Sequence, residues 1–310
     1  MKNYAVIDFS IGSVSLLIGG VEGRCQEVIF KTKTHLQLPD YMTSSGSLKA
    51  KGLERLLEEA DSLIKKANSL NVEDVYAIST TLLRNLENAD EIARKIQIHT
   101  GLELVNLSGA DEAYAVYVAN SRYRILEKAM LLHIGSSSTE LCDYSQPRKD
   151  AMFSLDFGAE TLARKFVKDL YPDDDELEDI HRHVVETIEN CREKTGKRKF
   201  ENAVVAGTNA RAVYKVYRAF YDIEEKQIPL MQTRKLERLQ KALRKEKKRT
   251  RLLLDNVPDK AYIILPVIET MLALLDHFNI NDITVSSLGV KEGWFRYMMD
   301  NKNEDRETTD

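Results

Sequence analysis

The chain has 310 residues, enough for one large core or two ordinary ones, and two domains is the better expectation. Hydrophobic residues make up 43% and charged residues 30%, as in globular proteins, and the formal net charge of -4 argues against a specific nucleic-acid partner. No apolar run is long enough to span a membrane, Asp8 interrupts any signal peptide, and the three cysteines fit no metal spacing. We therefore expect a cytoplasmic protein without a membrane partner.

Strands and helices alternate along the first half of the chain. Short apolar runs followed by small residues indicate strands, and apolar residues repeated every three or four positions indicate amphipathic helices. In chain order we expect strands at 4–10 and 13–23, a helix at 52–70, a strand at 75–80, a capped helix at 88–101, a strand at 102–107 and a helix from 109.

The same order begins again in the second half, with a strand, a small-residue turn and a strand at 128–145. After it we expect a helical region from Ala159, a helix opening at Pro172, a strand at 202–208 that opens onto a helix, an apolar helix at 264–278 and a strand at 282–289. Such alternation predicts an α/β fold. We expect two domains, 1–122 and 123–310, with a ligand in the cleft between them and with the helix after Gly293 packing back on the first.

Three turns that follow strands carry chemistry suited to phosphate: "DFSIGSVS" from Asp8, "HIGSSSTE" from His133 and "AGTNAR" from Ala206. Small residues let backbone amides approach an anion, and hydroxyl groups add donors. "STTLLRN" adds Thr80 and Arg84, and "LSGADEAYAVY" places Asp111 and Glu112 in the first turn of a helix. Acidic residues in that position are also ordinary helix capping.

These segments, in order along nearly the whole chain, resemble the exopolyphosphatase/guanosine pentaphosphate phosphohydrolase (Ppx/GppA) family of the actin-like (ASKHA) superfamily. "YAVIDFSIGSVSLLI" resembles the family's D-[IL]-G-S-N-S turn, "AISTTLLRN" its A-T-S-A-L-R-[DE], "LSGADEAYAVY" its I-S-G-x-E-E-A-R and "LLHIGSSSTEL" its [VI]-D-I-G-G-G-S-T-E. "SLDFGAETLARKF", "VVAGTNARAV" and "ITVSSLGVKEG" resemble later family segments. The resemblance implies two actin-like, ribonuclease H-like domains and a phosphohydrolase that uses Mg²⁺.

The resemblance also implies roles for particular residues. Glu112 would orient or deprotonate the attacking water, and Glu140, the second catalytic residue, would hold Mg²⁺ together with Asp8. The terminal phosphates would be bound by Ser13, Thr80, Arg84, Gly135, Ser136, Ser137, Ser138, Thr139, Gly207, Thr208 and Asn209. The ligand would be polyphosphate or a phosphorylated guanosine nucleotide, and the protein could form a homodimer.

The departures from the family lie in the same turns. Aligned without gaps, Ile11 replaces a small residue, although a shift of one residue would align "GSVS" with G-S-N-S. Ser136 and Ser137 replace two glycines, and any position that needs a positive φ would then be strained. His133 stands at the family's metal-binding aspartate. It could bind a transition metal, pair with phosphate when protonated, or donate to a backbone carbonyl as an ordinary strand-end histidine.

Three functions remain open. The first is a phosphohydrolase acting through Glu112 and Glu140, and the second is an impaired member that binds a phosphorylated ligand in a regulatory role. The third, a kinase or ATPase of the wider superfamily, is disfavoured by the ending "VSSLGVKEG". The basic segment 234–251 is either a rail for a polyanion or, as we prefer, a solvated helix face with Leu236, Leu239 and Leu243 turned inward.

Overall fold

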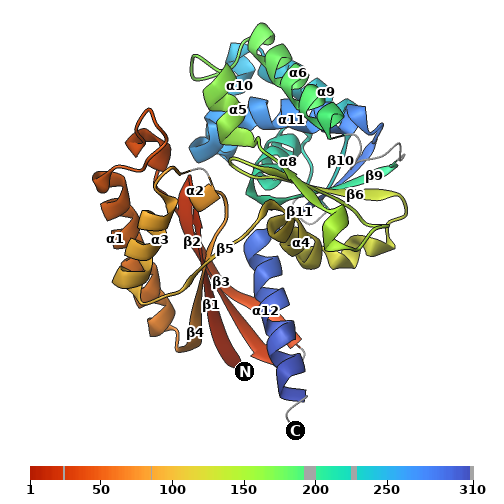
Figure 1. Cartoon of the computed structure of the whole chain (residues 1–310). Helices are drawn as coiled ribbons and strands as arrows, with labels where there is room; N and C mark the ends of the chain where they lie inside the picture. Colours follow the sequence, from red (N-terminus) through yellow and green to blue (C-terminus); the bar gives the residue numbers. More distant parts are fainter. Residues whose placement is uncertain (24, 85, 192–199, 225–228, 308–310) are drawn as a thin grey trace. The chain divides into compact units, whose positions relative to one another are not determined.

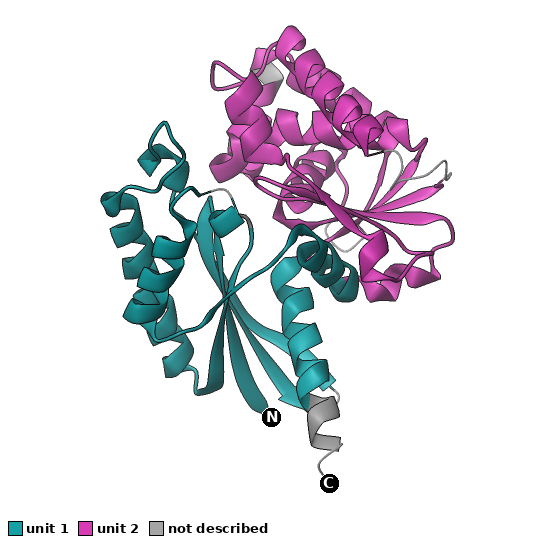
Figure 2. Ribbon diagram, in the orientation of Figure 1, with its two compact units in different colours: residues 1–119, 290–310 teal, residues 120–289 magenta. Residues whose placement is uncertain are grey.

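The computed structural model describes residues 1–23, 25–84, 86–191, 200–224 and 229–307. They divide into two compact units (Figure 2): unit 1 is Met1–Ala119 with Val290–Asp310, and unit 2 is Asn120–Gly289. The C-terminal helix therefore belongs to the unit that begins the chain. None of the described helices is long and apolar enough to cross a membrane.

Unit 1 is built on a five-stranded sheet of order β3-β2-β1-β4-β5, in which β1, β2 and β3 are antiparallel and β4 and β5 run parallel to β1. This is the ribonuclease H-like order of an actin-like domain. Its elements (Figure 1) are β1 (Lys2–Ser10), β2 (Ser13–Glu22), β3 (Cys25–His35), α1 (Ala50–Ser69), β4 (Val72–Ser79), α2 (Thr81–Arg84), α3 (Ala89–Thr100), β5 (Leu104–Asn106), α4 (Gly109–Ala119) and α12 (Val290–Glu307).

The two faces of this sheet are covered by different helices. Alternate residues of β1 and β2, such as Ile7 and Leu16, form a buried core with Leu56 and Leu63 of α1. The opposite face receives α12, where the ring of Phe295 packs on Gly19 so tightly that a Cβ there would come within 2.2 Å of it. Figure 1 shows α1 and α3 on one side of the sheet and α12 on the other.

Unit 2 repeats the plan with a six-stranded sheet of order β10-β11-β9-β6-β7-β8. The run β8-β7-β6-β9-β11 has the order and directions of the unit 1 sheet, and β10 is added antiparallel at the edge. Its elements are β6 (Ala129–Ile134), β7 (Thr139–Asp143), β8 (Phe153–Leu155), α5 (Ala159–Phe166), α6 (Asp174–Asn190), β9 (Asn202–Ala206), α8 (Gly207–Tyr221), β10 (Leu230–Gln232), α9 (Thr233–Leu243), α10 (Glu246–Asn256), α11 (Ile264–His277) and β11 (Asp282–Ser286).

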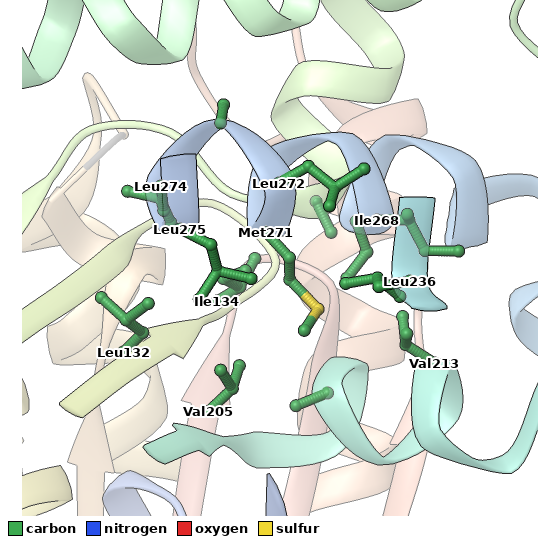
Figure 3. Packing of buried hydrophobic residues seen from close by; sticks show 14 of the residues in the cluster. Leu132, Ile134, Val205, Val213, Leu236, Ile268, Met271, Leu272, Leu274 and Leu275 are labelled. Atoms are coloured by element: carbon green, nitrogen blue, oxygen red, sulfur yellow. The ribbon is translucent and has the colours of Figure 1, made fainter. Parts of the chain in front are cut away.

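The core of unit 2 lies around α11, which is buried along most of its length. Ile268, Met271 and Leu275 of this helix pack with Leu132 of β6 and Val205 of β9 (Figure 3). Helix α11 is thus a central helix, and this explains why its sequence is apolar almost all round rather than on one face.

Several local predictions from the sequence were wrong. Helix α6 begins after Asp173, whose side chain accepts from the amide of Glu176 in a capping box, so Pro172 lies outside the helix. Helix α3 is capped at its C-terminus by Gly101 in the left-handed region, as expected, but at its N-terminus the side chain of Asn88 exchanges hydrogen bonds with the backbone of Leu48 and makes no capping bond. The basic segment forms two helices, α9 and α10, although Leu236, Leu239 and Leu243 are buried as expected.

Candidate functional site

In unit 1 the polar side chains gather where β1 ends and β2 begins. Asp8 lies opposite Ser15 in the β1–β2 ladder, and parallel pairing with β4 brings Thr80 beside it. Thr80 Oγ1 donates to Asp8 Oδ1 at 3.2 Å, and Ser15 Oγ lies 3.5 Å from Asp8 Oδ2. At the tip of the hairpin, the hydroxyls of Ser10 and Ser13 are 2.9 Å apart. The structure therefore brings Asp8 and Thr80 together.

Ile11, which replaces a small residue of the family in the turn between these strands, has an ordinary backbone conformation. It is buried in the core of unit 1, and it is not among the described residues with positive φ. The turn thus uses Ile11 as an apolar anchor, and the hydroxyls of Ser10 and Ser13 contact each other across it.

A lysine that sequence reasoning missed completes this group. Lys291, in the first turn of α12, donates from Nζ to Ser15 Oγ at 2.5 Å. Burial raises the pKa of Asp8 above its ordinary value, although the charges of Lys291 and Lys33 act in the opposite direction. Burial likewise lowers the pKa of Lys291, against the attraction of Asp8 and Glu292. A partly buried carboxylate and a partly buried ammonium group thus share one hydroxyl.

Arg84 and Glu112 form a direct ion pair in unit 1. Arg84 Nη1 donates to Glu112 Oε1 and, at 3.0 Å, to the backbone carbonyl of Leu107. Glu112 is only 2% exposed, whereas its neighbour Asp111 accepts from the amide and hydroxyl of Ser108 at the start of α4. The capping interpretation therefore applies to Asp111, and Glu112 is held by the arginine.

In unit 2, His133 and Glu140 are cross-strand partners on β6 and β7. His133 Nδ1 lies 2.5 Å from Glu140 Oε2, and Ser154 Oγ donates to Oε1 at 3.0 Å. Of the alternatives considered for His133, the bond to a backbone carbonyl was wrong, because Nδ1 bonds to Glu140. Burial raises the pKa of Glu140, but the hydrogen bond and the charge of His133 outweigh burial and hold this pKa below its ordinary value. Glu140 is 1% exposed, so this is a buried imidazole–carboxylate pair.

The turn 135–138 keeps most of its hydroxyls occupied within unit 2. Thr139 Oγ1 donates to the carbonyl of Phe157 at 2.8 Å, Ser136 Oγ donates to Glu160, and Ser138 bonds to Glu140. Ser137 Oγ is buried and, among the described residues, has no hydrogen-bond partner. Neither Ser136 nor Ser137 has a positive φ, so replacing the two family glycines by serine causes no backbone strain of the kind considered above. A backbone hydrogen bond closes the turn: the Gly135 amide donates to the Ser138 carbonyl at 2.9 Å.

The third turn forms the start of α8 and contacts the end of β6. Gly207 has φ of 94°, and a Cβ there would come within 2.6 Å of the His133 ring. Asn209 donates to the carbonyls of Ile134 and Gly135 at 3.0 and 3.2 Å, and its carbonyl oxygen accepts from Lys260. Thr208 is exposed and lies 3.3 Å from Lys260 Nζ. Asn209 thus holds the start of α8 against the end of β6. Thr208 and Lys260 are the polar side chains of this turn that lie nearer the surface.

The donor groups of neither unit, taken by itself, suit Mg²⁺. This ion prefers six oxygen ligands in octahedral geometry. Asp8 already has a lysine beside it, and both oxygens of Glu140 are bonded to His133 and Ser154. Within the described ranges, no group of three or more His, Cys, Asp or Glu residues is placed to hold a metal ion. The residues described within each unit therefore do not form a Mg²⁺ site by themselves.

The two sheets with their matching strand order define an actin-like α/β protein whose hairpin turns carry hydroxyl and carboxylate groups. The model of the Ppx/GppA phosphatase family matches residues 18–302. The chain belongs to this family.

Relatives with curated names include Exopolyphosphatase 1 of Mycobacterium tuberculosis, 28% identical over 167 residues that cover 53% of this chain and 48% of that protein. A guanosine-5'-triphosphate,3'-diphosphate pyrophosphatase of Photobacterium profundum is 22% identical over 299 residues, covering 96% of this chain and 59% of that protein. The chain therefore spans about half the length of the curated relatives that it matches.

Solved structures show the same fold. An exopolyphosphatase from Cytophaga hutchinsonii matches with a TM-score of 0.84 at 18% identity, over 97% of this chain and 98% of that chain. The Aquifex aeolicus Ppx/GppA family member matches with a TM-score of 0.79 at 19% identity, over 97% and 99%. At such identities the likeness establishes the fold alone.

Proposed function

We propose that the protein hydrolyses the terminal phosphoanhydride bond of inorganic polyphosphate or of guanosine pentaphosphate and releases phosphate. Membership of the family supports this proposal, and the names of two relatives, an exopolyphosphatase and a guanosine-5'-triphosphate,3'-diphosphate pyrophosphatase, cover both substrates. The three cysteines are free, which is consistent with our proposal that the protein works in the cytoplasm.

The observation that carries the proposal is the contact between Arg84 and Glu112. These residues come from different segments, and the family resemblance assigns phosphate binding to one and water activation to the other. The arginine stabilises the ionised form of a buried carboxylate, and a general base must be ionised to accept a proton from water. A phosphate that draws the guanidinium toward itself would leave Glu112 a stronger base beside the bound ligand.

The turn in unit 2 supports a phosphate contact through its backbone. Among the described residues, the amides of Ser136, Ser137 and Ser138 donate to no backbone acceptor, and Ser137 Oγ is likewise unpartnered. Gly158 lies directly beneath, where a Cβ would come within 2.5 Å of the Ser137 nitrogen. Several amides in one tight turn favour an anionic ligand. We propose that this turn binds phosphate oxygens through its amides rather than through its hydroxyl groups.

The alternative is a family member that binds a phosphorylated ligand and hydrolyses it little. The pairing of His133 with Glu140 favours this alternative, because it occupies the second carboxylate to which the resemblance gives a catalytic role. The two proposals differ only in turnover, since both require binding.

Release of phosphate from long-chain polyphosphate and from guanosine pentaphosphate tests the proposal, measured with Mg²⁺ and again with EDTA. We expect wild-type release to fall at least about a hundredfold in Glu112→Gln, since a positioned base contributes about 10²–10⁴-fold. Glu103→Gln, a change at an exposed glutamate of the same unit, is the matched control. Saturable binding without release would favour the alternative, and the absence of both would exclude both.

A further inference from the structure

One face of the unit 1 sheet carries an unusual group of charges next to α12. Residues paired directly across antiparallel strands have their side chains on the same face. Ser15 of β2 is paired with Asp8 on one side and with Lys33 of β3 on the other, so all three share the face that α12 covers. Lys291 enters this group from the first turn of α12. We call Asp8, Ser15, Lys33 and Lys291 the Asp8 cluster.

The hydrogen bonds of the Asp8 cluster place an ammonium group one hydroxyl away from the carboxylate. Lys291 Nζ donates to Ser15 Oγ at 2.5 Å, and Ser15 Oγ lies 3.5 Å from Asp8 Oδ2. Ser15 is only 2% exposed, so this bridge is shielded from bulk water. Charges act more strongly on each other in such an environment than at the surface.

The neighbouring acidic residue is in direct contact with a different lysine, although its charge also acts on Lys291 and on Asp8. Glu292, the next residue of α12, accepts from Lys31 Nζ at 2.6 Å. The direct ion pair of Glu292 is therefore with Lys31, whereas Lys291 makes its hydrogen bond to Ser15 beside Asp8. With Lys33 on the same face, the Asp8 cluster holds two lysines for one carboxylate.

We propose that Lys291 is a built-in cation that takes, at Asp8, the electrostatic place of a divalent metal ion and binds a phosphate oxygen of the ligand. Asp8 then serves to orient the lysine and to offset its charge while no ligand is bound. The choice of a phosphate ligand rests on the proposed function, whereas the pairing of Lys291 with Asp8 does not. Phosphoryl-transfer sites need positive charge near the terminal phosphate, and a lysine can supply it as a point charge.

The first experiment measures Mn²⁺ binding by the full chain, by electron paramagnetic resonance without any phosphate ligand. Lys291→Met removes the ammonium group but keeps an unbranched side chain of similar length. We expect this variant to bind Mn²⁺ at least about tenfold more tightly than wild type, because carboxylates are the preferred ligands of such hard cations. The gain should disappear in Lys291→Met/Asp8→Asn, which lacks the carboxylate. An equal gain in Lys65→Met, which alters an exposed lysine of α1, or no gain in Lys291→Met, overturns the proposal.

The second experiment measures binding of inorganic tripolyphosphate by calorimetry in EDTA, and it includes a variant that keeps the lysine. We expect Lys291→Met to weaken binding at least about tenfold while Lys65→Met does not, since charge-assisted bonds to phosphate are strong. Asp8→Asn should strengthen binding, because it frees Lys291 from its carboxylate. Weaker binding in Asp8→Asn, or wild-type binding that requires a divalent ion, contradicts the proposal even where Lys291→Met does not fold.

The two experiments separate the inference from the proposed function. If Lys291→Met gains Mn²⁺ through Asp8 but the wild type binds no tripolyphosphate and hydrolyses no polyphosphate, the proposed function fails and only the Lys291–Asp8 pairing stands. If polyphosphate is hydrolysed but Mn²⁺ binding is unchanged by Lys291→Met, the proposed function stands and the built-in cation is wrong.

Discussion

At the scale of single residues, the candidate functional groups that the structure describes are mostly bonded to one another. Arg84 is bonded to Glu112, His133 to Glu140, and Lys291 to Ser15 beside Asp8. Each pair joins a residue that the family resemblance places at the site with a partner that neutralises it. Substituting one member therefore changes the stability of the protein as well as its chemistry, and both must be measured.

Arg84→Ala illustrates this double effect. It leaves the buried Glu112 carboxylate without its guanidinium, and we expect a loss of about 1–3 kcal/mol in the free energy of unfolding, the usual cost of an unsatisfied buried group. Phosphate-ligand affinity should fall as well. Chemical denaturation and calorimetry check the two effects, with Arg94→Ala, at an exposed arginine of α3, as the control. A variant of unchanged stability would mean that the pair contributes nothing to the fold.

His133→Asp should convert the imidazole–carboxylate pair into two facing carboxylates. Without metal, we expect a loss of about 3 kcal/mol or more, since Glu140 is left buried beside a like charge. Mg²⁺ should raise the melting temperature of this variant more than that of wild type, because two carboxylates on paired strands offer the oxygen ligands that it prefers. His133→Asn, which adds no charge, is the control and should show no such gain. Equal stabilisation of all three proteins by Mg²⁺ would refute this expectation.

At the scale of elements, α6 packs on α11 through a contact that includes a histidine whose charge depends on pH. His181 Nδ1 lies 2.8 Å from Glu269 Oε1, and Glu269 also accepts from Gln240 of α9. The hydrogen bond from Glu269 raises the pKa of His181 above its ordinary value of 6.5, and burial opposes it. The stability from this contact is therefore fully present below about pH 6.5 and is lost as the pH rises through the raised pKa.

His181→Gln should accordingly reduce the fall in unfolding free energy between pH 6 and pH 8. The histidine is about 40% exposed, so we expect a change below about 1 kcal/mol after solvent screening. Urea denaturation at several pH values measures it. His183→Gln is the comparison, because burial lowers the pKa of His183 and its removal should change the slope in the opposite direction. Identical slopes in both variants would contradict the assignment.

The start of α8 allows a matched test of a crowded glycine. Gly207→Ala should cost about 1–2 kcal/mol for the left-handed φ, and about 1–3 kcal/mol more because the new methyl group meets the His133 ring. Gly101→Ala, also at positive φ but with no atom within 4 Å, should show only the first cost. Equal losses in thermal denaturation would show that His133 moves aside freely.

The sequence predicts the buried elements better than the edges. β1, β2 and β6 follow from their apolar runs, whereas β3 was missed because its residues are mostly exposed at the sheet edge and β8 because it has three residues. The Asp8–Thr80 contact follows from parallel pairing of β1 with β4. The His133–Glu140 pair could have been read from the hairpin, since pairing of Ile134 with Thr139 makes them partners. The contact of Lys291 with Ser15 could not be predicted from the sequence, because only tertiary folding brings α12 to β2.

At the scale of the whole molecule, α12 joins the distant part of the chain to unit 1. Phe295 is 2% exposed and packs on Gly19, and Gly293 lies so close to the Ala115 carbonyl that no side chain fits between them. Phe295→Ala should therefore cost about 3–5 kcal/mol. Tyr297→Ala, at a partly exposed residue of the same helix, should cost less. Guanidinium denaturation compares the two, and a larger loss at Tyr297 would mean that α12 is held mainly by its outer face.

Because α12 completes unit 1, the chain leaves that unit after Ala119 and re-enters it at Val290. During synthesis on a ribosome, the first sheet must wait for all of unit 2 before Phe295 reaches Gly19 and Lys291 reaches Ser15. A nascent chain stalled before Val290 would expose the bare face of α4 and carry an Asp8 without its lysine. The order of translation thus delays assembly of the Asp8 cluster until the second unit has been made.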